Sequence, residues 1–301
     1  MIFFRPIGDK NTASSRLRVW NIQPHIENSY VGIADDYQKG DVLIIQKAPD
    51  INELRKAKSQ GAKVIYDIDD YYWDSPDFCK MLNECDLITT DTPKKKEMLE
   101  KQWSSKEIVV IPDSLDWDGT KKTEYGNGVI GWTGYGNNSQ YLNPVIEKLP
   151  FPIRLICTSD WINYIKAPAL NVQSRPWSLE MVDKYLAECD LGMYYLPDGD
   201  FEQCKGMHKL LKNWAIGLPT YTSPMPDYVR AMKEAGVGEK YLVKTLEDWK
   251  DIKFVPFDEK CRKYALKYEA KEIAKLWKNI LSSLQSQEEE ILSKDNQSKK
   301  A

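Results

Sequence analysis

The segment CDLGMYYLPDGDFEQCKGMHKLLKNWAIGLPTYTS, residues 189–223, decides the fold of this chain. Its apolar run at 191–196 is short and rich in aromatic residues, which is typical of a parallel strand buried on both faces. A Pro-Asp-Gly-Asp loop ends that strand. From about residue 203 the apolar period becomes helical, and Gly217 followed by Pro219 is a typical helix end. The segment therefore predicts strand, loop, helix and strand.

Three lysines of the predicted helix, Lys205, Lys209 and Lys212, share one face at i, i+4 and i+7 spacing. In an open α/β sheet, the loop after a strand and the N-terminus of the next helix form the binding crevice. Unpaired backbone N–H groups there favour an anion. Lys205 and Lys209, one turn apart, suit a diphosphate. A basic helix face exposed to solvent is the alternative that the spacing alone leaves open.

Length and composition limit the class of protein. With 301 residues, 42% of them hydrophobic and 11% aromatic, the chain can build two α/β domains with sizeable cores. A net charge of −3 argues against general nucleic-acid binding. The six cysteines form no C-x-x-C pair, which indicates reduced core thiols. We see no signal-peptide pattern after Met1 and no apolar run of membrane-spanning length, so we expect a cytoplasmic protein without an integral membrane segment.

Strands and helices alternate along both halves of the chain, which predicts two doubly wound parallel sheets. A helix is predicted to open near Ser14 and to include His25, and a long amphipathic helix is predicted over 258–284. We also expect a short strand at 240–243. The polar residues 116–127 are a natural linker. The expected parts are a domain at 1–120, a domain at 126–257, a helix at 258–285 and a disordered tail at 286–301.

Three aspartates, Asp67, Asp69 and Asp70, directly follow the predicted strand at 63–66. Carboxylates gathered at the carboxyl end of a strand repel one another, so their presence favours a ligand, a cation or a base role. One hypothesis is that they position or deprotonate an attacking hydroxyl. Turn and cap chemistry, or a metal site, are the alternatives.

Several motifs, in their order along the chain, resemble those of GT-B glycosyltransferases of the family 4 type. The run K-G-M-H-K-L-L-K-N-W-A-I-G-L-P at 205–219 is similar to the family's K-S-x-x-K-x-x-E-x-x-A-x-G-x-P motif. The run I-G-W-T-G at 130–134 resembles the opening of the family's C-terminal domain, and S-S-R-L-R at 14–18 resembles its S-x-R-x-R run. D-I-D-D-Y-Y-W at 67–73 is similar to a run in relatives. The chain is compact, as phage members of the family tend to be.

The resemblance implies the GT-B fold, in which two Rossmann-like domains face a central cleft and a C-terminal helix packs back on the first domain. It implies that the second domain binds a nucleotide-sugar donor, expected to be a UDP-sugar, and that the first domain receives the acceptor. It also implies retention of anomeric configuration, no required cofactor and no metal ion. The donor-binding residues to which it points are Arg16, Thr133, Gly134, Tyr135, Arg175, Lys205, Gly206, Met207, His208 and Lys209. It favours catalytic roles for Asp67, Asp69 and Asp70.

One departure from the family pattern concerns the donor ribose. Cys204 and Lys212 occupy the positions of the family's E-x7-E glutamates. Recognition of the ribose by a carboxylate therefore requires a substitute, for which Glu202 and Asp200 are candidates.

The sequence thus predicts a glycosyltransferase that moves a sugar to a hydroxyl of a glycan, a lipid or a small molecule. A phage-type DNA glycosyltransferase acting on a hydroxymethylated base is an alternative, because basic runs at 55–58 and 94–96 could hold phosphates. A non-catalytic nucleotide-sugar-binding module is an alternative of another class, because the paired glutamates are missing.

Overall fold

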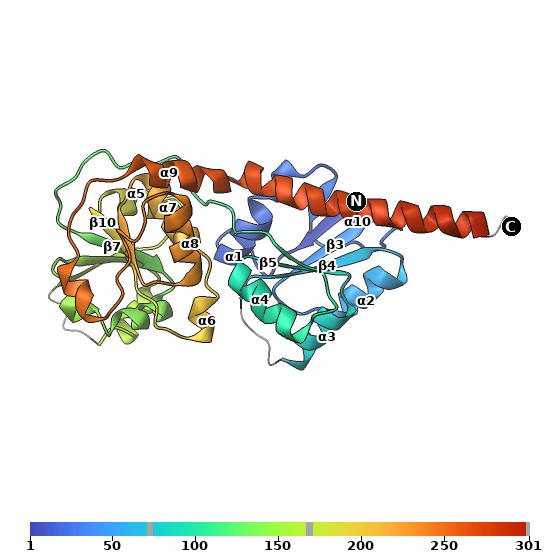
Figure 1. Ribbon diagram of the computed structural model, residues 1–301, viewed down its shortest axis with the longest axis horizontal. Helices are drawn as coiled ribbons and strands as arrows, with labels where there is room; N and C mark the ends of the chain where they lie inside the picture. Colours follow the sequence, from blue (N-terminus) through green and yellow to red (C-terminus); the bar gives the residue numbers. More distant parts are fainter. Residues whose placement is uncertain (71–74, 167–170, 299–301) are drawn as a thin grey trace. The chain divides into compact units, whose positions relative to one another are not determined.

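The computed structural model describes residues 1–70, 75–166 and 171–298, the last fourteen of these by backbone alone. The chain divides into two compact units (Figure 1). Unit 1 comprises Met1–Ser114 and Glu269–Ala301, and unit 2 comprises Leu115–Tyr268. Each unit contains one parallel sheet, so the predicted doubly wound α/β fold is confirmed.

Unit 1 is built on a six-stranded sheet in the order β2-β1-β3-β4-β5-β6. Its strands are β1 (Ile2–Arg5), β2 (Ser29–Val31), β3 (Val42–Gln46), β4 (Lys63–Ile68), β5 (Leu87–Thr90) and β6 (Ile108–Val110). Its helical segments are α1 (Ala13–Ser15), η1 (Arg16–Trp20), η2 (Gln23–His25), α2 (Ile51–Ser59), α3 (Pro76–Glu84), α4 (Pro93–Gln102) and α10 (Ala270–Ser298). The central strands β3 and β4 are buried along most of their length, which explains their nearly continuous apolar sequences.

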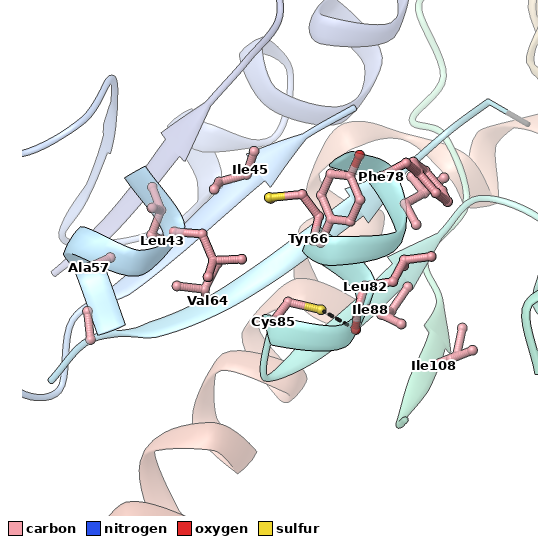
Figure 2. Packing of buried hydrophobic residues seen from close by; sticks show 14 of the residues in the cluster. Leu43, Ile45, Ala57, Val64, Tyr66, Phe78, Leu82, Cys85, Ile88 and Ile108 are labelled. Atoms are coloured by element: carbon pink, nitrogen blue, oxygen red, sulfur yellow. Dashed lines mark hydrogen bonds between the residues drawn. The ribbon is translucent and has the colours of Figure 1, made fainter. Parts of the chain in front are cut away.

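Helices α2, α3 and α4 cover one face of this sheet. Figure 2 shows side chains of β3 and β4, among them Ile45 and Tyr66, packed with side chains of α2 and α3. The rings of Tyr66 and Phe78 meet edge to face, with centroids 5.6 Å apart. Phe3 packs into the same cluster, whereas the next residue, Phe4, meets Trp277 of α10. Because successive side chains of a strand point to opposite faces, α10 covers the other face.

Unit 2 is built on a five-stranded sheet in the order β11-β10-β7-β8-β9. Its strands are β7 (Ile130–Gly134), β8 (Ile153–Cys157), β9 (Val172–Pro176), β10 (Leu191–Tyr194) and β11 (Thr220–Thr222). Its helices are α5 (Val182–Ala187), α6 (Asp200–Gln203), α7 (His208–Ile216), α8 (Pro226–Glu234) and α9 (Glu259–Ala265). Its shorter helical turns are η3 (Gly136–Leu142), η4 (Ile146–Lys148), η5 (Ser159–Asn163), η7 (Glu247–Asp251) and η8 (Leu266–Tyr268).

The first helical region differs from the prediction of one helix from Ser14 through His25. It forms the short α1, a π-helical turn and a separate 3₁₀ turn that contains Pro24. Ser15, the last residue of α1, is buried. Its hydroxyl accepts a hydrogen bond from the Gly8 N–H and donates one to Gln46 Oε1. The serine thus connects the loop after β1 to the end of β3.

The C-terminal region also differs from the predicted single helix over 258–284. The helix is interrupted at η8, where the Tyr268 carbonyl accepts a hydrogen bond from the Leu115 N–H at 2.6 Å. Beyond this interruption, α10 continues to Ser298, whereas we expected a disordered tail from residue 286. No glycine or proline interrupts the sequence of α10, so nothing in its backbone preferences ends the helix earlier.

The strand expected at 240–243 is reduced to one β-bridge, between Thr222 and Leu242. The six cysteines are free, as predicted, and all of them except Cys79 are buried.

Candidate functional site

The sheet of unit 2 reverses its strand order between β7 and β10. Chain order proceeds from β7 through β8 to β9 on one side, and from β10 to β11 on the other. In open α/β sheets the crevice beyond the carboxyl ends of the two strands at such a switch point is the usual ligand site. The loops that follow β7 and β10 are joined here, because Tyr141 donates a hydrogen bond to Glu202 at 2.9 Å. Glu202, a candidate for the ribose, is therefore already engaged by a tyrosine of its own unit.

Lys209 of α7 reaches this switch point from the helix side. Its Nζ lies 5.6 Å from the ring centroid of Trp132 on β7 and 5.5 Å from that of Tyr194 on β10. A Cβ atom added to Gly134 would lie 3.2 Å from the same Nζ and 2.8 Å from the Trp132 ring. Glycine at position 134 therefore allows the ammonium group to approach the backbone at the end of β7.

Among the described residues, the Lys209 ammonium has no internal counter-charge. Within the described part of the chain, no carboxylate lies at ion-pair distance from it, and its Nζ lies against the rings of Trp132 and Tyr194. Burial lowers the pKa of Lys209 to about 8, and the neighbouring charge of Lys205 contributes to the decrease. An anion at this point would reverse both effects, because it would supply the missing negative charge.

The helix that carries Lys209 begins later than predicted. The sequence period suggests a start near residue 203, but α6 ends there and α7 begins at His208, with Met207 as the N-cap. Met207 makes no side-chain capping hydrogen bond to α7, and the N–H groups in the first turn of any helix lack an intrahelical acceptor. Gly206 directly precedes the N-cap. The sulfur of Met207 contacts Arg230 and Tyr264 at 3.8 and 3.9 Å, which anchors the start of α7.

Lys205 lies in the connection between α6 and α7, and not on the helix. Its Nζ is 3.9 Å from the ring centroid of Phe201 on α6. After burial, its charge is the second cause of the lowered pKa of Lys209. The structure therefore brings Lys205, Gly206, Met207, His208 and Lys209 together around the start of α7, but in a turn followed by a helix.

The remaining predicted donor residues of unit 2 have different surroundings. Thr133 is buried, and its hydroxyl donates to the Ile156 carbonyl of the neighbouring strand at 2.9 Å. Tyr135 is half exposed at the start of η3. Arg175 lies on the edge strand β9 with its guanidinium against the ring of Tyr185, away from the β7–β10 switch point.

Lys212 does not share the surroundings of Lys209, contrary to the common basic face that the spacing predicts. It is buried, and its Nζ lies 2.6 Å from Asp183 and 3.4 Å from Asp116. Cys204, the other residue at an E-x7-E position, is also buried. The sequence did not single out Trp132 and Tyr194, although both are aromatic residues in or beside the quoted motifs.

In unit 1, Asp67 takes part in a buried ion pair. Both of its oxygens accept hydrogen bonds from Arg18, at 2.7 and 2.5 Å, and Thr89 donates a further one at 2.7 Å. The side chains of Arg18 and Asp67 are each only 1% exposed. Arg18 also binds Asp113 and the Ile111 carbonyl. Both carboxylate oxygens of Asp67 are therefore engaged within unit 1.

Asp69 differs from its two neighbours in the predicted catalytic cluster. Its Oδ1 is buried and accepts no hydrogen bond within the described residues, although Lys47 Nζ lies 3.9 Å away. Burial raises the pKa of Asp69 above its ordinary value. Asp70 instead receives a hydrogen bond from Lys47. Lys95 contacts both the Asp69 carbonyl and the Asp91 carboxylate, and burial raises the pKa of Asp91 too. Residues 71–73, which complete the D-x-D-D-x-x-W run, lie outside the described residues.

Other charged groups of unit 1 are engaged locally. The guanidinium of Arg16 donates to the Lys10 carbonyl at 2.7 Å, and the residue is buried. The basic runs at 55–58 and 94–96 form ion pairs with nearby acids, among them Arg55–Glu84, Lys58–Asp86, Lys94–Glu97, Lys95–Asp91 and Lys96–Glu100. These runs are therefore not an unneutralised surface for nucleic-acid phosphates.

No group of three or more His, Cys, Asp or Glu is arranged to hold a metal ion within residues 1–70, 75–166 and 171–298. Over the same stretches, every helix is too short or too polar to cross a membrane.

The protein has an α/β fold built on two doubly wound parallel sheets, each with a switch point in its strand order. Neither a family model nor a curated protein matches the sequence. Solved structures, in contrast, match over most of the chain, and they are GT-B glycosyltransferases.

Three of these structures show the extent of the similarity. The GtfA/B complex matches with a TM-score of 0.57 and 12% identity, over 83% of this chain and 58% of that one. A TarM variant of S. aureus, in complex with fondaparinux, α-GlcNAc-glycerol and UDP, matches with a TM-score of 0.60 and 13% identity, over 81% and 56%. The α,α-trehalose-6-phosphate synthase of Burkholderia multivorans matches with a TM-score of 0.56 and 8% identity, over 84% and 72%. The chain thus spans less than two thirds of the GtfA/B and TarM chains.

Proposed function

We propose that this chain is a glycosyltransferase that moves a sugar from a UDP-sugar to an acceptor hydroxyl. One observation carries the proposal: Lys209 is a partly buried ammonium group, at the switch point of a parallel sheet, for which the described residues supply no counter-charge. Such a group is costly to the fold unless an anion binds there. The diphosphate of a nucleotide sugar has the charge that the site lacks.

In this proposal unit 2 is the donor domain. The diphosphate is bound by Lys209, by the N–H groups at the start of α7 and by the charge of Lys205. During transfer, negative charge grows on the departing diphosphate, and an ammonium group already in place stabilises that charge without reorganising. The uridine assignment is supported by the UDP found in the structurally similar TarM complex.

Unit 1 is the acceptor domain in this proposal, and Asp69 is its reactive carboxylate. Asp67 is hydrogen-bonded to Arg18 and Asp70 is bonded to Lys47. Of the three carboxylates, Asp69 therefore has the buried oxygen, Oδ1, that receives no hydrogen bond from the described residues. We assign to it the role of orienting the attacking hydroxyl and withdrawing its proton. The raised pKa of Asp69 suits that role, because a stronger base takes a proton more readily near neutral pH.

Retention of anomeric configuration and independence from metal ions complete the proposal. They follow from the sequence resemblance. Retention is also described for a trehalose-6-phosphate synthase that matches this chain with a TM-score of 0.53. No observation favours DNA as the acceptor, since both basic runs are paired with acids of the same unit.

The test is release of UDP from a panel of UDP-sugars, first with water and then with free sugars, glycosides and lipids as acceptors. The proposal predicts slow UDP release that an acceptor accelerates. Asp69→Asn should retain UDP binding and lower turnover by roughly 10²- to 10⁴-fold. The exposed Asp77→Asn is the matched control and should have wild-type turnover. Tight UDP binding without any turnover would instead identify a nucleotide-sugar-binding module.

A further inference from the structure

Lys47 occupies the switch point of the other sheet. In unit 1 the strand order reverses between β1 and β3, and Lys47 is the first residue after β3. The loop after β1 closes over the same point, because both the Ile7 N–H and the Ser15 hydroxyl donate to Gln46 Oε1. The residue therefore lies where this class of sheet binds ligands.

The backbone of Lys47 is strained. Its φ is +65°, and the Ala48 N–H donates to the Gln46 carbonyl at 2.8 Å, so Lys47 is the central residue of a positive-φ γ-turn. This turn is rare and unfavourable for a residue with a Cβ atom. Among described non-glycine residues, only Asn28 also has positive φ, and asparagine tolerates that region. A glycine at position 47 would form the same turn at lower cost, so the lysine side chain itself needs an explanation.

Two hydrogen bonds from β4 hold the strained turn in place. The Lys47 N–H donates to the Asp67 carbonyl at 2.8 Å, and the Tyr66 hydroxyl donates to the Lys47 carbonyl at 2.7 Å. Both Tyr66 and Asp67 are buried in the sheet. With both backbone groups fixed in this way, the direction of the side chain is also restricted. The ammonium group reaches the end of the neighbouring strand, where it bonds to Asp70 and lies 3.9 Å from Asp69 Oδ1.

We propose that Lys47 is a positioning residue for transfer, whose strained turn aims an ammonium group at Asp69 and keeps that buried carboxylate ionised for the acceptor hydroxyl. The inference rests on the proposed role of Asp69. It adds a residue that touches neither donor nor acceptor and acts through the carboxylate.

The charges around Asp69 determine whether removal of the Lys47 charge raises or lowers the pKa of Asp69. Burial raises its pKa most, and Asp70 raises it further, whereas Lys47, Arg18 of η1 and Lys95 of α4 lower it. Of the other groups that face it, Asp113 repels it and Tyr66 is neutral. Because an ionised base is needed, activity is present above its pKa and lost as the pH falls through it. Removal of the Lys47 charge raises that pKa, so the acid limb of the activity profile must move to higher pH.

The experiment compares pH profiles of UDP release from the UDP-sugar that the wild type turns over. Lys47→Met should shift the acid limb upward by about one pH unit, and Lys47→Arg should restore most of the wild-type profile. Lys63→Met is the matched control, since Lys63 is partly exposed at the other end of β4 and its ion pair with Asp86 has the same 3.9 Å length. Its profile should equal that of the wild type.

Lys47→Gly separates strain from charge. It should have the same shifted pH profile as Lys47→Met. It should also unfold at a higher temperature than Lys47→Met, because glycine relieves the strain of the γ-turn. An unshifted acid limb in both variants, with UDP release still measurable, would overturn the role of Lys47 and leave the proposed function intact. If no UDP-sugar were turned over at any pH, the proposed function would fail and this inference with it.

Discussion

The two sheets of this protein place cations at their carboxyl ends in opposite ways. In unit 1, Arg18 is bonded to Asp67 and Asp113, and Lys95 is bonded to Asp91. In unit 2, Lys209 lies between two aromatic rings, and no carboxylate of the described residues neutralises it. The cations named in unit 1 are neutralised by carboxylates of the same unit, whereas Lys209 has no such partner among the described residues.

The difference separates two uses of charge. A buried ion pair with all its hydrogen bonds fixes the geometry of a strand end, although it adds little net stability over apolar packing. A buried cation without a partner is destabilising until an external anion binds. We therefore infer that unit 1 uses its charges to hold one carboxylate, Asp69, and that unit 2 keeps Lys209 for a ligand. The predictions below test this contrast.

The largest expected effect is on the stability of unit 1. Arg18→Met leaves Asp67 buried without its partner, so the free energy of unfolding should decrease by roughly 3–5 kcal/mol. Urea denaturation measures this loss. Arg175→Met on the exposed edge strand is the control and should change stability by less than about 0.5 kcal/mol. A loss below about 1 kcal/mol for Arg18→Met would show that the unit 1 network does not hold the fold as we describe.

Lys209→Met should change the free energy of unfolding in the direction opposite to that of Arg18→Met. Removal of an unpaired ammonium group should raise the free energy of unfolding at pH 7 by roughly 1–3 kcal/mol. The gain should disappear as the pH rises from about 8, the pKa of Lys209 in the fold, to its ordinary value. In that interval the unfolded wild type holds a proton that the folded form has lost, so wild-type stability increases.

Lys212→Met is the matched variant one turn along the same helix. It leaves Asp183 buried without its counter-charge and should therefore lower stability. If both lysine variants shifted stability in the same direction, the contrast between a paired and an unpaired lysine would be incorrect.

UDP binding should depend on pH through Lys209. Affinity should be highest below about pH 8 and should then fall with rising pH, because the free protein loses the proton that the diphosphate needs. Lys209→Met should weaken binding by roughly 10- to 100-fold, the value of a charge-assisted hydrogen bond. Isothermal titration calorimetry measures both effects. Lys209→Arg should bind UDP with an affinity that is flat from pH 7 to 9.5, and a wild-type affinity equally flat over that range would contradict the assignment.

The smallest effect is expected at Lys205. Its ammonium group rests against Phe201 and repels that of Lys209, so Lys205→Ala should raise the pKa of Lys209. UDP binding should weaken by only about two- to fivefold, because a partly exposed charge contributes little. Calorimetry in the same buffers should show the pH-dependent decrease in affinity beginning at higher pH. A loss as large as that of Lys209→Met would make Lys205 the main phosphate ligand.

Most strands, but not the one expected at 240–243, and the helix end at Gly217 could be predicted from sequence, because apolar runs and turn residues act locally. Gly217 has φ of +100°, as a C-terminal glycine requires. The start of α7 could not be placed, since apolar spacing continues through residues 204–207 although the chain turns there. The strand order, which defines both switch points, depends on long-range pairing that no local pattern records.

The roles of individual charged residues could be predicted only in part. Lys209 was selected through its spacing and family resemblance, but spacing gave Lys212 the same status, and only the location of Asp183 separates the two. Asp67, Asp69 and Asp70 are close in sequence, and their different hydrogen bonds depend on Arg18 and Lys47, which are distant in the chain. The strain at Lys47 has no sequence signal, since lysine is not a residue that marks a positive-φ turn.

A crystal structure of the protein with UDP tests the central claim most directly. We predict a phosphate oxygen within about 3.2 Å of Lys209 Nζ, at the end of β7 and the start of α7. UDP bound elsewhere, with the Lys209 ammonium still in contact only with Trp132 and Tyr194, would contradict it.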